Sequence, residues 1–123
     1  MKQYHLNKLS PDLWGEIGGI DLSKDFNEEI QNKIYDDLIN YKVLFFREQN
    51  ITPQFHVEFA KSFGSIEEPH PVYPHVEGFP EIVLLENDKD NPPDTDEWHT
   101  DVTFKNDPPF ASVLYSKITP EVG

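Results

Sequence analysis

The clearest periodic segment of the chain follows Asn27. Apolar residues recur there at spacings of four and three positions, at Ile30, Ile34, Leu38 and Tyr41. This spacing places them on one face of an α-helix, and asparagine is a residue type that caps helix N-termini. Glu28 and Glu29 suit the positive end of the helix dipole. We therefore predict an amphipathic helix that begins after Asn27 and turns its apolar stripe inward.

A second helix is predicted after Thr52. Threonine is a helix-capping residue, and Pro53 would occupy the first helical position, where a missing N–H does no harm. The residues expected on the inward face are Phe55, Phe59 and Phe63. Gly64 is typical of a helix end, so we expect the helix to stop there.

Short apolar or alternating runs predict strands elsewhere in the chain. The predicted strands cover residues 43–46, 82–85, 98–104 and 112–118, and residues 15–22 are predicted as a short strand pair or a bulged strand. The run at 43–46 is continuously apolar, which is typical of a strand buried on both faces. Residues 68–80 contain four prolines and residues 87–96 are polar, so both segments are predicted as loops. Helices are thus expected first and most strands later.

The composition is that of a single globular domain over residues 1–123, with 37% hydrophobic residues. Lysine and arginine number 10 against 23 aspartates and glutamates, for a formal net charge of −13. Such a charge opposes binding to nucleic acid and to anionic membrane surfaces. It leaves an anionic small substrate open, because a few placed groups and a bound cation set the field inside a pocket.

The compartment is suggested by what the sequence lacks. It has no cysteine, which excludes disulfides, thiolate metal sites and cysteine nucleophiles. Its N-terminal residues show no apolar signal core, and no apolar run approaches the roughly 20 residues of a membrane span. A cytoplasmic location is the expectation.

The first candidate for chemistry is His99 with Asp101. On a strand, residues two positions apart point to the same face, so the predicted strand 98–104 would project this imidazole and this carboxylate together. Two histidines and a carboxylate on one face of a metal are typical of non-haem Fe(II) oxygenases, and the pair would supply two of these three ligands. The alternative is two solvated polar residues on a strand face.

The proline-rich loop contains His70, Tyr73 and His75. Imidazole N–H and tyrosine O–H groups are hydrogen-bond donors, and on a stiff backbone they could recognise an anion. The alternative is that these are exposed loop residues without a ligand. We expect His5 and His56 to be structural.

Together these segments resemble a known family. Residues 98–104 (Trp-His-Thr-Asp-Val-Thr-Phe), 91–94 (Asn-Pro-Pro-Asp) and 70–75 (His-Pro-Val-Tyr-Pro-His) look like taurine dioxygenases, which are Fe(II)- and 2-oxoglutarate-dependent oxygenases. The resemblance also includes residues 43–47 and the helix end at Phe63-Gly64. Several distant motifs in the same order are far more specific than one short motif.

The resemblance implies a mainly β fold with flanking helices, a double-stranded β-helix of the jelly-roll, cupin-like type. It implies that His99 and Asp101 bind Fe(II) and that 2-oxoglutarate is the cosubstrate. O2 would then hydroxylate the sulfonate-bearing carbon of taurine or a related sulfonate, releasing sulfite with succinate and CO2 as co-products.

The resemblance also assigns substrate-binding residues. His70 would hold the sulfonate, with Tyr73 and Phe104 close to the substrate. Thr95 stands where taurine dioxygenases carry asparagine, so the substrate could instead be another sulfonate or a sulfate ester.

By the same resemblance, the distal iron-binding histidine and the arginine that holds 2-oxoglutarate lie beyond Gly123. We therefore expect an incomplete barrel and the N-terminal part of a longer oxygenase. A half barrel exposes edge strands and apolar faces, so the chain alone is expected to self-associate, a homo-oligomer being one outcome. The alternative function is a non-catalytic module in which His99, Asp101 and a loop histidine, His70 or His75, hold a metal, or in which the loop binds an anion.

Overall fold

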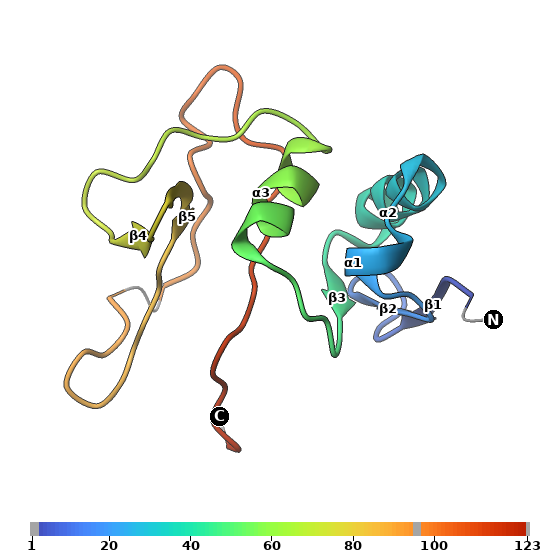
Figure 1. Ribbon diagram of the computed structural model, residues 1–123, viewed down its shortest axis with the longest axis horizontal. Coiled ribbons are helices and arrows are strands. Elements are labelled where there is room, and N and C mark those ends of the chain that lie inside the picture. The colour runs from blue at the N-terminus through green and yellow to red at the C-terminus, as the bar shows by residue number, and fades with distance from the viewer. Residues whose placement is uncertain (1–2, 95–96, 123) are drawn as a thin grey trace. The chain divides into compact units, whose positions relative to one another are not determined.

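The computed structural model describes residues 3–94 and 97–122 (Figure 1). They form two compact units, the first ending at Phe55 and the second beginning at His56. The first unit contains β1 (His5–Lys8), β2 (Gly15–Gly18), α1 (Leu22–Asp25), α2 (Glu28–Tyr41) and β3 (Leu44–Phe46). Helix α3 (Pro53–Lys61) spans the boundary, and β4 (His75–Val76) and β5 (Phe79–Val83) lie in the second unit. The expectation of one domain over residues 1–123 stays a prediction.

A three-stranded sheet in the order β1-β2-β3 organises the first unit. Strand β2 pairs antiparallel with β1 and parallel with β3, which confirms a strand within residues 15–22. Its Ile17 is 3% exposed and belongs to the apolar core. At Gly15 an added Cβ would lie 2.8 Å from the Leu6 side chain, which would have to move to make room for it.

Helix α2 confirms the helix predicted after Asn27. The Asn27 side chain accepts a hydrogen bond from the Ile30 N–H at 3.0 Å, as an N-cap should. Ile34 is 3% exposed on the inward face. At the other end Lys42 has φ 69°, and its N–H reaches the Leu38 carbonyl at 2.8 Å. Both ends of α2 are therefore closed by local hydrogen bonds.

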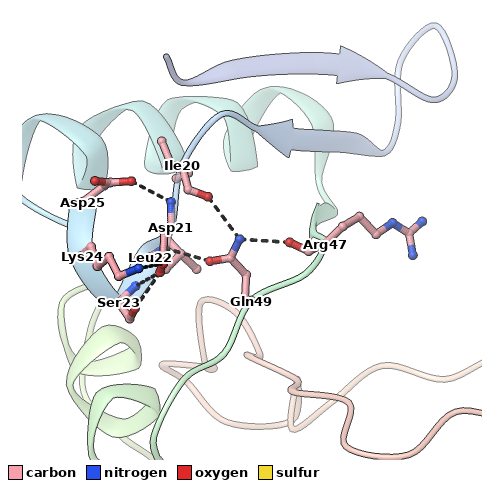
Figure 2. Close-up of polar contacts among 8 residues, drawn as sticks. All are labelled: Ile20, Asp21, Leu22, Ser23, Lys24, Asp25, Arg47 and Gln49. Atoms are coloured by element: carbon pink, nitrogen blue, oxygen red, sulfur yellow. Dashed lines mark hydrogen bonds and ion pairs between the residues drawn. The ribbon is translucent and has the colours of Figure 1, made fainter. Parts of the chain in front are cut away.

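The side chain of Gln49 connects two segments of the first unit (Figure 2). Its Oε1 accepts from the Leu22 N–H at 2.8 Å, while its Nε2 donates to the carbonyls of Ile20 at 3.2 Å and Arg47 at 3.0 Å. One amide thus satisfies backbone groups at the start of α1 and after β3, which would otherwise need water. The tight turn at α1 is closed by Asp21, whose side chain accepts from the Ser23 N–H.

The strand at 43–46 was predicted to be buried on both faces, and this is wrong. Strand β3 lies at the edge of its sheet, and Phe45 is 36% exposed. A continuous apolar run shows only that the side chains are apolar. An edge strand can carry the same residue types as a central strand. The alternating exposure of Leu44, Phe45 and Phe46 shows one face turned toward the core.

Helix α3 begins after Thr52 as predicted and ends at Lys61, before the predicted stop at Gly64. The Phe55 N–H donates to Thr52 Oγ1 at 3.1 Å, and Pro53 is the first helical residue. Phe59 is 6% exposed and meets Phe63 edge to face, with ring centroids 5.2 Å apart. The helix thus contributes an aromatic cluster to the second unit.

Strands β4 and β5 form a hairpin that begins inside the predicted loop 68–80. Val76 pairs with Phe79, and Gly78 has φ 79° in the two-residue turn between them. Glycine adopts this conformation without strain, which is why it favours hairpin turns. Pro80 lies within β5 and is tolerated because a two-stranded ribbon leaves one edge of each strand unpaired. The strand predicted at 82–85 is therefore confirmed only in its first residues.

The strands predicted at 98–104 and 112–118 are wrong. The structure shows turns, bends and irregular backbone over both segments, with Val102 at φ 54° and the Lys105 N–H bonded to the Val102 carbonyl at 3.2 Å. A strand needs a neighbouring strand to pair with, and none accompanies these segments within 3–94 and 97–122. The described residues thus form two small sheets and a few helices. The incomplete double-stranded β-helix that the resemblance implies stays a prediction. The expectation of helices first and strands later is also wrong, because β1 and β2 precede every helix.

None of the helices in the described residues is long and apolar enough to cross a membrane.

Candidate functional site

A surface cleft of about 410 Å³ lies in the second unit. The residues that line it are Tyr73, Leu85, Pro93, Asp94, His99, Asp101, Ser112 and Leu114. Three of the residues singled out from the sequence, Tyr73, His99 and Asp101, therefore share one cleft. The walls of the cleft combine these polar groups with apolar side chains.

The side chains of His99 and Asp101 lie close together in the cleft. Nε2 of His99 lies 3.3 Å from Oδ1 of Asp101. Nδ1 of the same ring lies 2.8 Å from the Glu97 carbonyl oxygen, and because a carbonyl only accepts, Nδ1 must carry the proton. In the neutral imidazole Nε2 is then a lone pair directed at a carboxylate, and two acceptors facing one another are suited to a shared cation.

This pairing arises from a turn, and not from the strand that the spacing suggested. Thr100 Oγ1 and Thr103 Oγ1 are hydrogen-bonded at 2.7 Å across the same turn, which Val102 completes with its positive φ. The side chains of His99 and Asp101 remain 57% and 68% exposed. The prediction that they lie together is confirmed, and the strand geometry offered as its reason is wrong.

The donor set fits a divalent metal in part. A histidine whose second nitrogen is held by a carbonyl, next to a carboxylate, is a common arrangement at metal centres, and it would fill two positions of a facial triad. Residues 3–94 and 97–122 contain no group of three histidine, aspartate or glutamate side chains that could hold a metal. Neither His70 nor His75 therefore completes the site there, contrary to one alternative from the sequence.

The loop histidine His70 forms a compact turn with Tyr73. Its Nδ1 lies 3.2 Å from the backbone nitrogens of both Val72 and Tyr73, which donate to it. Nδ1 is therefore unprotonated in the neutral ring, and Nε2 carries the hydrogen. The rings of His70 and Tyr73 lie 4.5 Å apart. The turn thus presents one N–H donor on an ordered backbone.

Asp94 is a cleft residue that the sequence analysis did not identify. Its Oδ2 accepts a hydrogen bond from the Tyr73 hydroxyl. This hydrogen bond, with the nearby negative charge, raises the pKa of Tyr73 above its usual 10.0. The one signal in the sequence is that Asp94 follows Pro92-Pro93, which restrict the backbone.

The other predicted residues are placed differently. Phe104 is 87% exposed and does not line the cleft, and neither does His70. Thr95 lies outside the described residues. His56 contacts the Val113 carbonyl through Nε2 at 2.9 Å, which agrees with the structural role expected for it.

A second long-range contact ties the turn near the cleft to the segment after α3. Lys105 Nζ lies 2.6 Å from Glu67 Oε2. The hydrogen bond to Glu67 raises the pKa of the Lys105 ammonium group. Because both side chains are exposed, this ion pair positions the turn more than it stabilises the fold.

An imidazole and a carboxylate brought together in a cleft can supply two of the three ligands of a facial triad, as in non-haem Fe(II) oxygenases. Residues 5–123 match the family described as "Taurine catabolism dioxygenase TauD, TfdA family". The chain belongs to this family of dioxygenases, as the motifs around His70 and His99 predicted.

Two relatives and one solved structure illustrate the likeness. An alkylsulfatase of Acinetobacter baylyi is 37% identical over 123 residues, which is 99% of this chain. An alpha-ketoglutarate-dependent sulfate ester dioxygenase of Pseudomonas putida is 39% identical over 114 residues, or 90% of this chain. The crystal structure of a taurine dioxygenase from Burkholderia xenovorans covers 68% of this chain with a TM-score of 0.60 and 34% identity, over 31% of its own chain.

The chain spans 38% and 36% of the length of the two relatives.

Proposed function

We propose that this chain supplies metal-binding and substrate-binding residues of a 2-oxoglutarate-dependent dioxygenase that cleaves small sulfate esters. The observation that carries the proposal is the convergence of His99 Nε2 and Asp101 Oδ1 in a cleft. Membership of a dioxygenase family supports it, as do the sulfate ester reactions in the names of both relatives.

His99 and Asp101 would hold Fe(II). When bound, the iron with 2-oxoglutarate and O2 would supply the oxidising power to hydroxylate the carbon that carries the sulfate group, with succinate and CO2 as co-products. The Glu97 carbonyl keeps the proton of His99 on Nδ1 and so leaves Nε2 available to the metal.

The substrate would be held by its two ends. The Nε2–H of His70 would donate to a sulfate oxygen, since the backbone hydrogen bonds to Nδ1 orient the ring. Apolar side chains of the cleft, Leu85, Pro93 and Leu114, would contact an alkyl chain and exclude water from it.

The product would then decompose without further help from the protein. Hydroxylation replaces one C–H bond by C–OH on the carbon that carries the sulfate. The hydroxyl loses its proton, its oxygen forms the carbonyl of an aldehyde, and the bond from carbon to the sulfate oxygen breaks to release sulfate. With a sulfonate the carbon–sulfur bond breaks in the same way and sulfite leaves.

Taurine or a related sulfonate is the second candidate substrate. Its ammonium group would find an acceptor in Asp94, which lies in the same cleft. The structural likeness to a taurine dioxygenase supports this reading. Phe104 and Thr95 stay predictions as substrate-binding residues, as do a cytoplasmic location and a homo-oligomer.

The test is product analysis of the enzyme that contains this chain, incubated with Fe(II), 2-oxoglutarate, O2 and either hexyl sulfate or taurine. We expect hexanal, sulfate and succinate in equal amounts, all dependent on 2-oxoglutarate. Sulfite from taurine at a higher kcat/KM would establish the second candidate. Sulfate binding without turnover of either compound would instead establish a non-catalytic binding module and contradict the proposal.

A further inference from the structure

We propose that Asp94 is a positioning residue, which holds the turn from His70 to Tyr73 in place by accepting the hydrogen bond of the Tyr73 hydroxyl. The proposal rests on the role proposed above for His70 as an oxyanion donor. Asp94 would contact neither the metal nor the sulfate group, and would act through Tyr73.

The hydrogen bond from Tyr73 to Asp94 connects two loops. Tyr73 and Asp94 are 21 residues apart, and both line the cleft that contains His99. Asp94 follows two prolines, whose rings fix the φ angles of the residues that lead to it. A carboxylate that accepts a hydrogen bond from a hydroxyl on another loop restrains that hydroxyl.

Tyr73 and His70 are held together by contacts within one turn. The Tyr73 N–H is one of the two donors to His70 Nδ1, and the two rings lie 4.5 Å apart. A displaced Tyr73 would therefore weaken the contacts that orient the His70 ring. Restraint of the Tyr73 hydroxyl is in this way transmitted to the Nε2–H of His70.

The negative charge of Asp94 also affects anion binding in the cleft. The Tyr73 hydroxyl has a single proton and donates it to Asp94, so it has none left for a sulfate oxygen. A negative carboxylate in the cleft also disfavours an anion beside it. Removal of Asp94 would therefore have two opposite effects on anion binding, a loss of order and a loss of repulsion, and suitable variants separate them.

Asp94→Ala removes both the acceptor and the charge, whereas Asp94→Asn removes the charge and keeps an oxygen that accepts from Tyr73. The experiment uses the 123-residue chain and inorganic sulfate as the probe, with binding followed by the ¹⁵N shift of His70 Nε2. If Asp94 positions the turn, Asp94→Ala should bind sulfate about threefold to tenfold more weakly, as for loss of a single hydrogen bond. Asp94→Asn keeps an acceptor for the Tyr73 hydroxyl, so its affinity for sulfate should stay within about twofold of that of the parent chain.

Tyr73→Phe removes the donor and provides the matched test. It should weaken sulfate binding as much as Asp94→Ala, and the double variant should show no further loss, since both remove one interaction. Unchanged backbone amide spectra outside the two loops would show that each variant folds.

Each other outcome has a definite meaning. Tighter sulfate binding in both Asp94→Ala and Asp94→Asn, or unchanged binding in Asp94→Ala, would overturn the positioning role and leave the proposed function standing. If sulfate does not shift His70 Nε2 in the parent chain, the oxyanion role of His70 fails, and the positioning role fails with it.

Discussion

Nε2 of His99 lies 3.3 Å from Oδ1 of Asp101, while Nδ1 of the same ring is held 2.8 Å from the Glu97 carbonyl. In the neutral imidazole the carbonyl keeps the proton on Nδ1, so the Nε2 lone pair faces the carboxylate. Two residues that are two positions apart in the sequence thus bring two ligand atoms, His99 Nε2 and Asp101 Oδ1, close together. This relationship is the basis of the proposed metal site.

Asp101→Ala should abolish metal binding, because the site loses its charged ligand. Titration of the chain with Mn(II), with free metal followed by electron paramagnetic resonance, should show affinity reduced by about a hundredfold or more, since even changes in groups that only orient metal ligands cost about tenfold to a hundredfold. Asp107→Ala is the control, an exposed aspartate of the same unit for which no shift in affinity is expected. Equal Mn(II) affinity in the two variants would refute the assignment.

His70→Ala should raise the substrate concentration that the enzyme needs and leave metal binding intact. Loss of a hydrogen bond to a charged group corresponds to an increase in KM of about tenfold or more. His75→Ala is a suitable comparison, since Nδ1 of His75 contacts the carbonyl of the adjacent Val76. A loss of metal in His70→Ala would place this histidine among the metal ligands instead.

The Tyr73 hydroxyl should titrate at an unusually high pH. Its pKa is raised from 10.0 chiefly by the hydrogen bond to Asp94, so this bond stabilises the fold below the pKa of the unfolded chain and is lost as pH rises through the folded pKa. Asp94→Asn should move the pKa back toward 10.0, measured by NMR of ¹³Cζ-labelled tyrosine. Asp88→Asn, in the same predicted loop 87–96, should leave the pKa of Tyr73 unchanged. An equal shift in both variants would mean that the negative charge of this segment as a whole, and not the hydrogen bond to Asp94, raises the pKa.

Gln49→Ala should destabilise the first unit by about 1–3 kcal/mol, because it leaves backbone groups of Ile20, Leu22 and Arg47 without their partner. Hydrogen exchange of the Ile17 amide, in the central strand, reports this free energy. Asn50→Ala, at the neighbouring exposed position, should change it little. Equal protection in both variants would mean that water replaces the Gln49 contacts without cost.

Asn27→Ala should destabilise α2 by about 1 kcal/mol through loss of its N-cap. Asn32→Ala, at an exposed position within the helix, should be neutral or slightly stabilising, since alanine has the higher helix propensity. Urea denaturation followed by helix circular dichroism compares the two. A loss of stability in Asn32→Ala equal to that in Asn27→Ala would contradict the capping role.

The helices were predictable because their signals are local. The Asn27 and Thr52 caps each bond to a backbone group three residues away, and apolar spacing alone identifies the buried face. The strands were less predictable, because a strand forms only with a partner. The segment at 43–46 did pair and the segment at 112–118 did not, although both were predicted as strands.

Some residues of the candidate site were predictable from the sequence and others were not. The roles expected of His70, His99 and Asp101 followed from short motifs and from the family resemblance. The partnership of Tyr73 with Asp94 was not predictable, since it joins residues 21 positions apart. Leu85, Ser112 and Leu114 carry no sequence signal that would place them in the same cleft.

By itself, then, the sequence determined the two longer helices with their N-caps, the adjacency of His99 and Asp101, and membership of the family. Tertiary structure alone decided which apolar runs became strands, which residues line the cleft, and that Gln49 and Asp94 are the side chains that join distant segments. The physical reason is that contacts within about four residues depend on local geometry alone. Contacts between distant residues require closure of a loop, whose entropic cost is met only when many such contacts form together.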